Sequence, residues 1–479
     1  MTGSGARAAS SGWTALLGRD NLVLSLALSG GAALHAVNLY ISITVLPSAV
    51  REIGGLDLYA WNTTVFVLAS LLGAAMSSSV LAHAGPRGGY ASAALVFIVG
   101  ALICAAAGAM PVMLAGRFVQ GLGGGLLLAL AYAMVRRVYA EPLWPRALAL
   151  LSGMWGVTTL LGPAIGGHFA EHGLWRGSFL AAIPIAVLVG LAAFFVLPKR
   201  EGEQEWGATP PVAQLALLTL AVFAASWGGV GASLASTVVG IVAALGLVGV
   251  FVVLERRSRR RLLPAGTFRP PTALGSLYAV SALLAATVTS TEIFLPLFLQ
   301  DLHGRSPLEA GYIAAVMSAG WTAAAIFSSG LDAARRSMAV RAGPVLSLGA
   351  MAVLVFVMPW AGRESDGLVL VLICGALAAA GAGVGLAYPL LSTMVLRVAP
   401  SAEADNAAAS IMTVQLCATA FGAALAGLAV NLAGAVAGTG SLDAANAARW
   451  LFITLAAAPA LCCIVMNSTS FKLAVRLSR

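Results

Sequence analysis

Three titratable side chains lie inside long apolar stretches of the sequence: Glu292, His35 and Arg117. Charged groups in hydrocarbon cost from about 3 to above 10 kcal/mol, so such residues usually face a cavity or a partner. Glu292, in TVTSTEIFLPLFLQ, is the carboxylate that lies well inside such a stretch. Burial disfavours its ionised form, so it can hold a proton near neutral pH and release it when its cavity fills with water. We expect Glu292 to carry protons; the alternative is a structural carboxylate near the outer face that caps a helix or pairs with a neighbour.

His35 precedes Asn38 and Ser42 at a spacing that places all three on one helical face about 60° wide. Histidine titrates at about pH 6.5, so His35 is a second candidate for binding protons or substrate. Its alternative is a neutral, hydrogen-bonded residue of the interior. Asn38 and Ser42 are candidates for lining a substrate cavity.

Arg117 begins the stretch RFVQGLGGGLLLALAYAMVRR, and Gln120 follows one helical turn later. The long stem of arginine lets the guanidinium reach along a helix toward a cavity. A fixed cation favours the ionised form of any carboxylate within about 4–6 Å. Arg117 is therefore the third proton-coupling candidate, acting on Glu292 or another acid, with a structural hydrogen-bonding role as the alternative. Gln120 is a further candidate for the substrate cavity.

Aromatic side chains inside the apolar stretches suggest a cavity for a drug-sized ligand, because such cavities have mostly apolar and aromatic walls. These candidates, with one further amide, are Trp61, Trp155, Phe294, Tyr388 and Gln415. Packing in the interior or anchoring at the membrane surface is the alternative for each. The sequence has no phosphate-binding Gly-Lys-Ser/Thr loop and no His-Glu-x-x-His helix. We therefore expect no enzyme activity, no cofactor and no metal.

Membrane-spanning helices must position these side chains. The chain is 60% hydrophobic and 9% charged, with a mean hydropathy of +0.93, whereas a soluble domain carries about 25% charged residues. A bilayer core about 30 Å thick requires about 20 apolar residues per helix. Apolar runs bounded by charged residues, glycine or proline predict fourteen spans, namely 21–49, 58–82, 89–109, 112–135, 147–169, 178–197, 212–229, 235–254, 272–299, 308–330, 341–361, 367–396, 406–434 and 448–468.

The distribution of basic residues predicts the orientation of these spans. With the amino terminus inside, most of the 27 lysines and arginines fall in cytoplasmic segments, as the positive-inside rule requires. The net charge of +9 then reflects membrane topology, so nucleic acid is not an expected partner. The cluster RRSRRR (256–261) is expected to be a cytoplasmic loop able to touch anionic lipid. We expect an unprocessed protein of the inner cell membrane with both termini in the cytoplasm.

Two segments of the sequence repeat the same order of features. GLGGGLLLALAYAMVRRVYAEPLWPRALALLSGM (121–154) parallels GAGVGLAYPLLSTMVLRVAPSAEADNAAASIMTV (381–414). Parallel halves of this kind are typical of transporters that hold substrate near the bilayer midplane. We predict two six-helix bundles and their connections, namely a cytoplasmic segment 1–20, a bundle 21–200, a linker 201–269 with two additional spans and a basic loop, a bundle 270–473 and a tail 474–479.

Several motifs resemble signatures of the major facilitator superfamily. They are GRFVQGLGGG (116–125), GMWGVTTLLGPAIGG (153–167) and LWRGSFLAAIP (174–184), which resemble its fourth, fifth and sixth helices. The additional hairpin, followed by LPLFLQDLHGRSPLEAGY (295–312), resembles the fourteen-span drug:proton antiporter family. The resemblance implies an all-α integral membrane protein with the major facilitator fold, and an influence of Arg117 on proton transfer. It also implies a gating bend in the fifth helix, with an ordinary kink as the alternative, at Gly162, Pro163, Gly166 and Gly167.

Two motifs depart from the pattern of that family, at Ser79, His83 and Ala84 and at Asn38. In SVLAHAGPRGGY (79–90), His83 replaces the aspartate of the loop between the second and third helices, which leaves His83 and Arg87 as gating or packing candidates. In VNLYISITVLP (37–47), Asn38 stands where these antiporters have an acid. An amide cannot take up and release a proton, so a mechanism based on that acid does not carry over.

The sequence thus predicts a proton-coupled exporter of small amphiphilic or aromatic compounds that works by alternating access. One alternative is a proton-independent facilitator or importer of a small metabolite on the same fold. The other is a transporter-like membrane receptor that binds ligand without moving it. The expected partners are a small-molecule substrate, protons and membrane lipid, and the expected state is a monomer.

Overall fold

The computed structural model describes residues 13–19, 21–199, 211–230, 234–258, 261–268, 272–360, 366–400, 403–436 and 443–477. Residues 1–12 of the predicted amino-terminal segment, 201–210 of the predicted linker and 478–479 of the predicted tail lie outside this description. The regular structure of the described residues is entirely helical. Twelve of these helices are long and apolar enough to cross a bilayer.

The helices follow one another along the chain with short connections. They are α1 (Trp13–Leu16), α2 (Leu22–Ile53), α3 (Tyr59–Ala105), α4 (Met110–Val138), α5 (Trp144–Glu171), α6 (Trp175–Val196), α7 (Val212–Trp227), α8 (Leu234–Arg257), α9 (Ala273–His303), α10 (Pro307–Ser329), α11 (Ala333–Val357), α12 (Asp366–Val398), α13 (Ala404–Val436), α14 (Ala444–Asn467) and α15 (Thr469–Leu477). Two 3-10 turns, Leu56–Leu58 and Glu141–Leu143, precede α3 and α5.

Two features separate these twelve helices from the fourteen predicted spans. The predicted spans 58–82 and 89–109 belong to one helix, α3, which has 47 residues and a single non-helical residue, Gly85, at φ 66° before Pro86. A straight helix of that length would measure about 70 Å, roughly twice the bilayer core. The predicted span 212–229 is the apolar helix α7, which has only 16 residues. The number of membrane crossings therefore depends on two points. One is whether the two arms of α3, before and after Gly85, cross the membrane separately, and the other is whether α7 crosses it.

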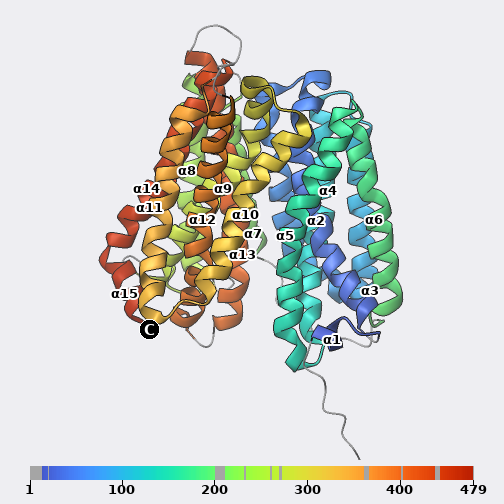
Figure 1. The fold of residues 1–479 in the computed structure, drawn as a ribbon. Coiled ribbons are helices and arrows are strands. Elements are labelled where there is room, and N and C mark those ends of the chain that lie inside the picture. The colour runs from blue at the N-terminus through green and yellow to red at the C-terminus, as the bar shows by residue number, and fades with distance from the viewer. Residues whose placement is uncertain are drawn as a thin grey trace, which may run out of the picture.

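The helices form two groups that lie side by side (Figure 1). The first helix group is α2–α6, and the second helix group is α9–α14. They meet where α5 packs on α10, where α3 packs on α13, and where α2 touches α9 and α10. Helices α7 and α8 pack on each other, and α7 also contacts α3 and α13. We call the end of the bundle that holds α1 and α15 the α1 end, and the other the opposite end (Figure 1).

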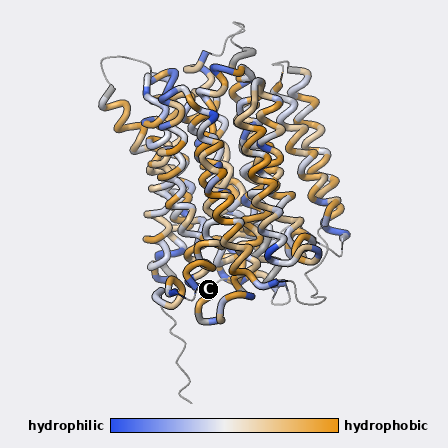
Figure 2. Tube along the Cα trace, turned by 90° about the vertical axis from the view of Figure 1, so that its right-hand side faces the viewer, coloured by the Kyte–Doolittle hydropathy of each residue, from blue (hydrophilic) through white to orange (hydrophobic). Residues whose placement is uncertain are grey.

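Apolar side chains cover the outside of the bundle along its middle. Figure 2 shows hydrophobic residues along the lengths of the helices, with hydrophilic residues gathered toward the two ends. Large apolar side chains are exposed there; Leu188 of α6, for example, is 66% exposed. A soluble protein rarely exposes so much contiguous apolar surface, and this band is the surface expected to face lipid.

The glycine-rich part of α4 packs directly on the backbone of α3. A Cβ atom at Gly125 would lie 2.0 Å from the Ser70 carbonyl oxygen, and one at Gly123 would lie 2.4 Å from the Phe97 nitrogen. Ser70 and Phe97 belong to the two arms of α3, one on each side of Gly85. Small residues let membrane helices approach this closely. The glycines after Arg117 are therefore required because α4 lies against both arms of α3.

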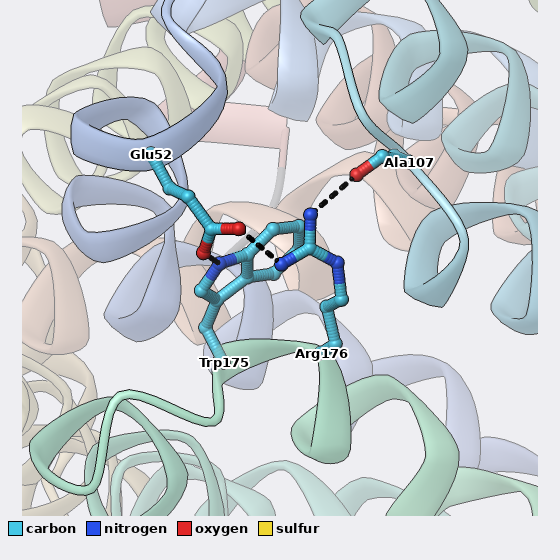
Figure 3. Close-up of polar contacts among 4 residues, drawn as sticks. All are labelled: Glu52, Ala107, Trp175 and Arg176. Carbon is cyan, nitrogen blue, oxygen red and sulfur yellow. Dashed lines mark hydrogen bonds and ion pairs between the residues drawn. The ribbon is translucent and has the colours of Figure 1, made fainter.

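Polar contacts fasten the opposite end of the bundle. The Glu52 carboxylate, at the end of α2, accepts hydrogen bonds of 2.6 Å each from Trp175 Nε1 and Arg176 Nη1 at the start of α6 (Figure 3). Arg176 Nη2 also donates to the carbonyl oxygen of Ala107, which follows α3. Arg51 pairs with Asp301 of α9 at 3.0 Å, which joins the two helix groups at this end.

Candidate functional site

Glu292 lies in the second half of α9 and faces the junction between the helix groups. It is 6% exposed. Its Oε1 atom accepts a hydrogen bond of 2.8 Å from the Ser318 hydroxyl of α10. Among the described residues, no lysine, arginine or histidine forms an ion pair with it. A buried carboxyl with one neutral donor and no cation is able to exist in both protonation states, as a proton carrier must.

Tyr40 of α2 connects this carboxyl to the first helix group. Its hydroxyl lies 3.5 Å from Ser318 Oγ, at the limit of a hydrogen bond, and Thr159 of α5 is a further hydrogen-bonding partner. Position 162 of α5 has to be glycine here, because a Cβ atom would lie 2.3 Å from Tyr40 Cβ. Four helices, α2, α5, α9 and α10, therefore meet around a chain of hydroxyl groups that ends at Glu292.

Arg117 lies in a different place, inside the first helix group. It is 0% exposed. Its Nη1 atom donates to Asn38 Oδ1 and, at 2.8 Å, to Gln120 Oε1. Its guanidinium carbon lies 3.9 Å from the centre of the Phe66 ring, within the range of a cation–π contact. Arg117 thus contacts neutral amides and an aromatic ring, and Glu292 is not among its hydrogen-bond or ion-pair partners.

His35 and Ser42 belong to the same interior cluster as Arg117. His35 is 2% exposed and stacks on Phe66 at 5.3 Å between ring centres, with the edge of Trp155 at 6.0 Å. Ser42 donates to Asn62 Oδ1 at 2.7 Å. Together with Asn38, these residues face α3 and α4, so the shared face expected from their spacing is present.

Several nitrogen atoms of this cluster are buried and have no hydrogen-bond partner among the described residues. They are His35 Nδ1, Asn38 Nδ2, Asn62 Nδ2, Arg117 Nη2 and Gln120 Nε2. Each such group costs about 1–3 kcal/mol when it is left unpaired. Water molecules are the common partners of buried polar groups of this kind.

The aromatic candidates are distributed over four separate contacts, one of which is that of Trp155 with His35. Tyr388 donates to Gln415 Oε1 at 3.2 Å and packs on Trp321, with ring centres 5.6 Å apart. Trp61 packs edge-on against Phe223 of α7 at 5.2 Å.

Phe294 is a packing residue of α9, stacked between two other rings at 5.0 Å from Tyr59 and 6.1 Å from Phe298. The candidates Trp61 and Phe294 therefore lie in packing contacts apart from the pair Tyr388 and Gln415.

The glycine and proline residues of α5 contact two different helices. A Cβ atom at Gly166 would lie 3.0 Å from the Ile41 carbonyl oxygen of α2, and one at Gly167 would lie 2.6 Å from Leu308 Cα of α10. Pro163 faces Gly311 of α10. This part of α5 is wedged between α2 and α10, at the contact between the two helix groups.

His83 and Arg87 lie far from this contact, near the kink of α3. His83 is exposed, and its Nδ1 atom lies 2.7 Å from the Ser79 carbonyl oxygen. Arg87 donates from Nε to the carbonyl oxygen of Leu197, which follows α6, at 2.5 Å. Arg87 thus ties the second arm of α3 to the end of α6.

Sequence reasoning missed Tyr40 and Ser318. Both are hydroxyl residues in apolar helices, which is a common and unspecific signal. Tyr40 lies two positions after Asn38, so on a helix it points away from the face that was singled out. Its partner Ser318 is remote in the sequence, and a single sequence carries no signal for such a contact.

Comparisons with known proteins agree on one family. Residues 28–423 match the model described as the Major Facilitator Superfamily. A "Probable multidrug-efflux transporter" of Mycobacterium tuberculosis (strain ATCC 25618 / H37Rv) is 38% identical over 463 residues, which are 93% of this chain and 94% of that protein. Multidrug resistance protein 3 of Bacillus subtilis (strain 168) is 25% identical over 313 residues, 62% of this chain and 59% of that protein.

Solved structures share the fold. A D-xylose-proton symporter superposes with a TM-score of 0.65 at 12% identity, covering 93% of this chain and 97% of that one. A peptide transporter in complex with sulfate gives a TM-score of 0.66 at 14% identity and covers 95% of both chains. At sequence identities this low, the similarity shows the fold alone.

Proposed function

The chain belongs to the major facilitator superfamily and is a membrane transporter, and from this premise we propose that it exports small amphiphilic or aromatic compounds in exchange for protons. The names of the relatives from Mycobacterium and Bacillus support export of drug-like compounds. The proposed substrate contacts in the second helix group are Tyr388 and its two neighbours, Trp321 and Gln415. Trp155 of α5, which is half-buried, is the proposed contact from the first helix group.

One observation carries the proton-coupling part of this proposal. Glu292 is a buried carboxyl in a bilayer-spanning helix, and Ser318 joins it to Tyr40 across the contact between the helix groups. A membrane potential of 100 mV is worth about 2.3 kcal/mol per charge moved. That energy corresponds to a gradient of about fiftyfold. One titrating carboxyl is therefore enough to drive export.

The direction of the hydrogen bonds links the protonation of Glu292 to this contact. An ionised carboxylate only accepts hydrogen bonds, so Ser318 donates to it and is free to accept from Tyr40. A protonated carboxyl can itself donate to Ser318, and the Ser318 proton then turns toward Tyr40. Protonation of Glu292 thus reverses the direction of the hydrogen bonds along the hydroxyl groups. This happens at the place where α2 of the first helix group meets α10 of the second.

Arg117 and Asn38 have a different role in this proposal. Their contact leaves a fixed cation beside a neutral amide, so it does not titrate in the way an arginine–carboxylate pair does. We assign them to the packing of α2 against α4, together with Gln120. His35, stacked on Phe66, remains the second proton-binding candidate.

The proposed topology restores fourteen spans. It requires that α3 cross the membrane twice, turning at Gly85, and that α7 cross once. The α1 end, which holds both described termini, faces the cytoplasm of a cell whose inner membrane contains the protein. The proposed bundles are then 21–200 and 270–473, with gating at the contacts of Gly162, Pro163, Gly166 and Gly167.

The test is ethidium transport by Glu292→Gln in proteoliposomes. We expect flux driven by a pH gradient to fall to the level of empty liposomes, while exchange of ethidium without a gradient continues, because glutamine keeps the hydrogen bond but carries no proton. The matched control is Glu171→Gln, an exposed carboxylate at the end of α5, which should behave as wild type.

Undiminished gradient-driven flux in Glu292→Gln would show that this carboxyl is not the carrier. Wild-type flux that ignores the pH gradient would favour the facilitator, and binding without flux the receptor.

A further inference from the structure

A pocket of about 280 Å³ lies at the α1 end of the second helix group, among α10, α11, α12 and α15. Arg336 and Ser337 line it from α11, and Thr393 and Arg397 line it from α12. The rest of the lining is mostly apolar. No acidic residue is among the described residues that line it. The pocket therefore combines a basic, hydroxyl-bearing rim with an apolar floor.

The pocket lies at the level where the membrane spans end. The apolar span of α10 ends at Ser329, that of α11 begins at Arg335, and that of α12 ends at Val398. Arg336 and Arg397 are therefore at the boundary of the hydrocarbon core, which is the level of lipid phosphates.

Arg336 is held in position by the protein. Arg336 is half-buried, and its Nε atom donates to the Leu331 carbonyl oxygen at 2.7 Å. Its Nη atoms donate to no other described residue. The neighbouring Arg335 instead pairs with Asp332 at 3.6 Å and is highly exposed. A guanidinium fixed through Nε presents its remaining N–H groups to an anion, and arginine matches phosphate oxygens in a bidentate manner.

Helix α15 contributes Val475 to the lining of the pocket. Its Phe471 and Ala474 are buried, and it packs on α9, α12 and α14. Its other faces expose apolar Leu473 together with basic Lys472 and Arg476. A short amphipathic helix with basic residues is typical of segments that lie in the lipid headgroup layer. The pocket thus opens at the level of the lipid headgroups.

We propose that this pocket binds the headgroup of an anionic phospholipid. Arg336 and Arg397 contact the phosphate, and Ser337 donates a hydrogen bond to one of its oxygens, whereas the Thr393 hydroxyl donates to the Pro389 carbonyl oxygen. The apolar floor takes the glycerol and the first part of an acyl chain. Basic pockets between helices on the cytoplasmic side are suited to such headgroups. This inference depends on the orientation given above and is independent of the substrate and of Glu292.

The test is lipid selection by the purified full chain in nanodiscs that contain phosphatidylglycerol and phosphatidylcholine. Spin-labelled phosphatidylglycerol reports the bound fraction. We expect wild type to enrich phosphatidylglycerol, and the double variant Arg336→Gln/Arg397→Gln to lose about tenfold of that enrichment, because charge-assisted hydrogen bonds are lost. The matched control is Arg341→Gln, an exposed arginine of α11 outside the pocket, which should keep it.

Three outcomes would overturn the proposal. The first is an unchanged enrichment in the double variant, and the second is an equal loss in Arg341→Gln, which would indicate general attraction by basic charge. The third is displacement of the lipid signal by excess inorganic phosphate, which would assign the pocket to a free anion. If the double variant does not fold, Arg336→Lys and Arg397→Lys are used, because they keep the positive charge and remove the planar guanidinium group. Each of these variants must then weaken the enrichment, and an unchanged enrichment in both would refute the site.

Discussion

Replacing Gly167 by alanine tests whether the packing of α5 on α10 keeps the opposite end of the bundle closed. The new Cβ atom would lie 2.6 Å from Leu308 Cα and 3.0 Å from Leu308 Cβ. Ordinary carbon–carbon contacts are about 3.5–4.0 Å, so the two backbones must separate by about 1 Å. Overpacking of this kind costs about 1–3 kcal/mol. We expect the ratio of closed to open protein at this end to fall about tenfold or more.

Gly156 of the same helix provides the matched control. A Cβ atom at this position meets no atom within 4 Å. Both alanines gain the same helix propensity, about 1 kcal/mol, so the difference between the two variants isolates the contact with α10.

The assay is the distance between spin labels at positions 171 and 312, two exposed sites near the opposite end, in a chain whose five native cysteines are replaced by alanine. Gly167→Ala should populate longer distances and Gly156→Ala should not. Identical distance distributions and identical ethidium flux in the two variants would refute the reasoning.

Two further predictions concern the polar groups of the interior. Arg117→Lys removes the guanidinium that donates to both Asn38 and Gln120, so we expect the unfolding free energy in detergent to drop by about 1–3 kcal/mol. An unchanged thermal midpoint would mean that these bonds contribute nothing. Tyr40→Phe removes the hydroxyl that reaches Ser318, and one neutral hydrogen bond is worth about 1 kcal/mol. We expect gradient-driven ethidium flux to fall by up to about fivefold with exchange preserved, and equal losses in both assays would contradict a role in coupling.

The amino-acid sequence by itself determined the class of this protein and most of its helices. Hydropathy depends only on neighbouring residues, so apolar runs of sufficient length identify membrane helices without knowledge of their partners. The motifs around Arg117 and Pro163 predicted the superfamily, and the comparisons confirm it. The burial of Glu292 and Arg117 followed from the same argument, because each lies inside an apolar run. The shared face of His35, Asn38 and Ser42 followed from the helical period.

Only the tertiary structure decided which of these side chains meet. Arg117 contacts Asn38 and Gln120, whereas Glu292 contacts Ser318 and, through it, Tyr40. Such contacts join residues far apart in the chain and depend on the packing of helices on each other. The geometry between the two arms of α3 was likewise decided by the backbone at Gly85. Hydropathy locates the two apolar segments but does not define how they are joined.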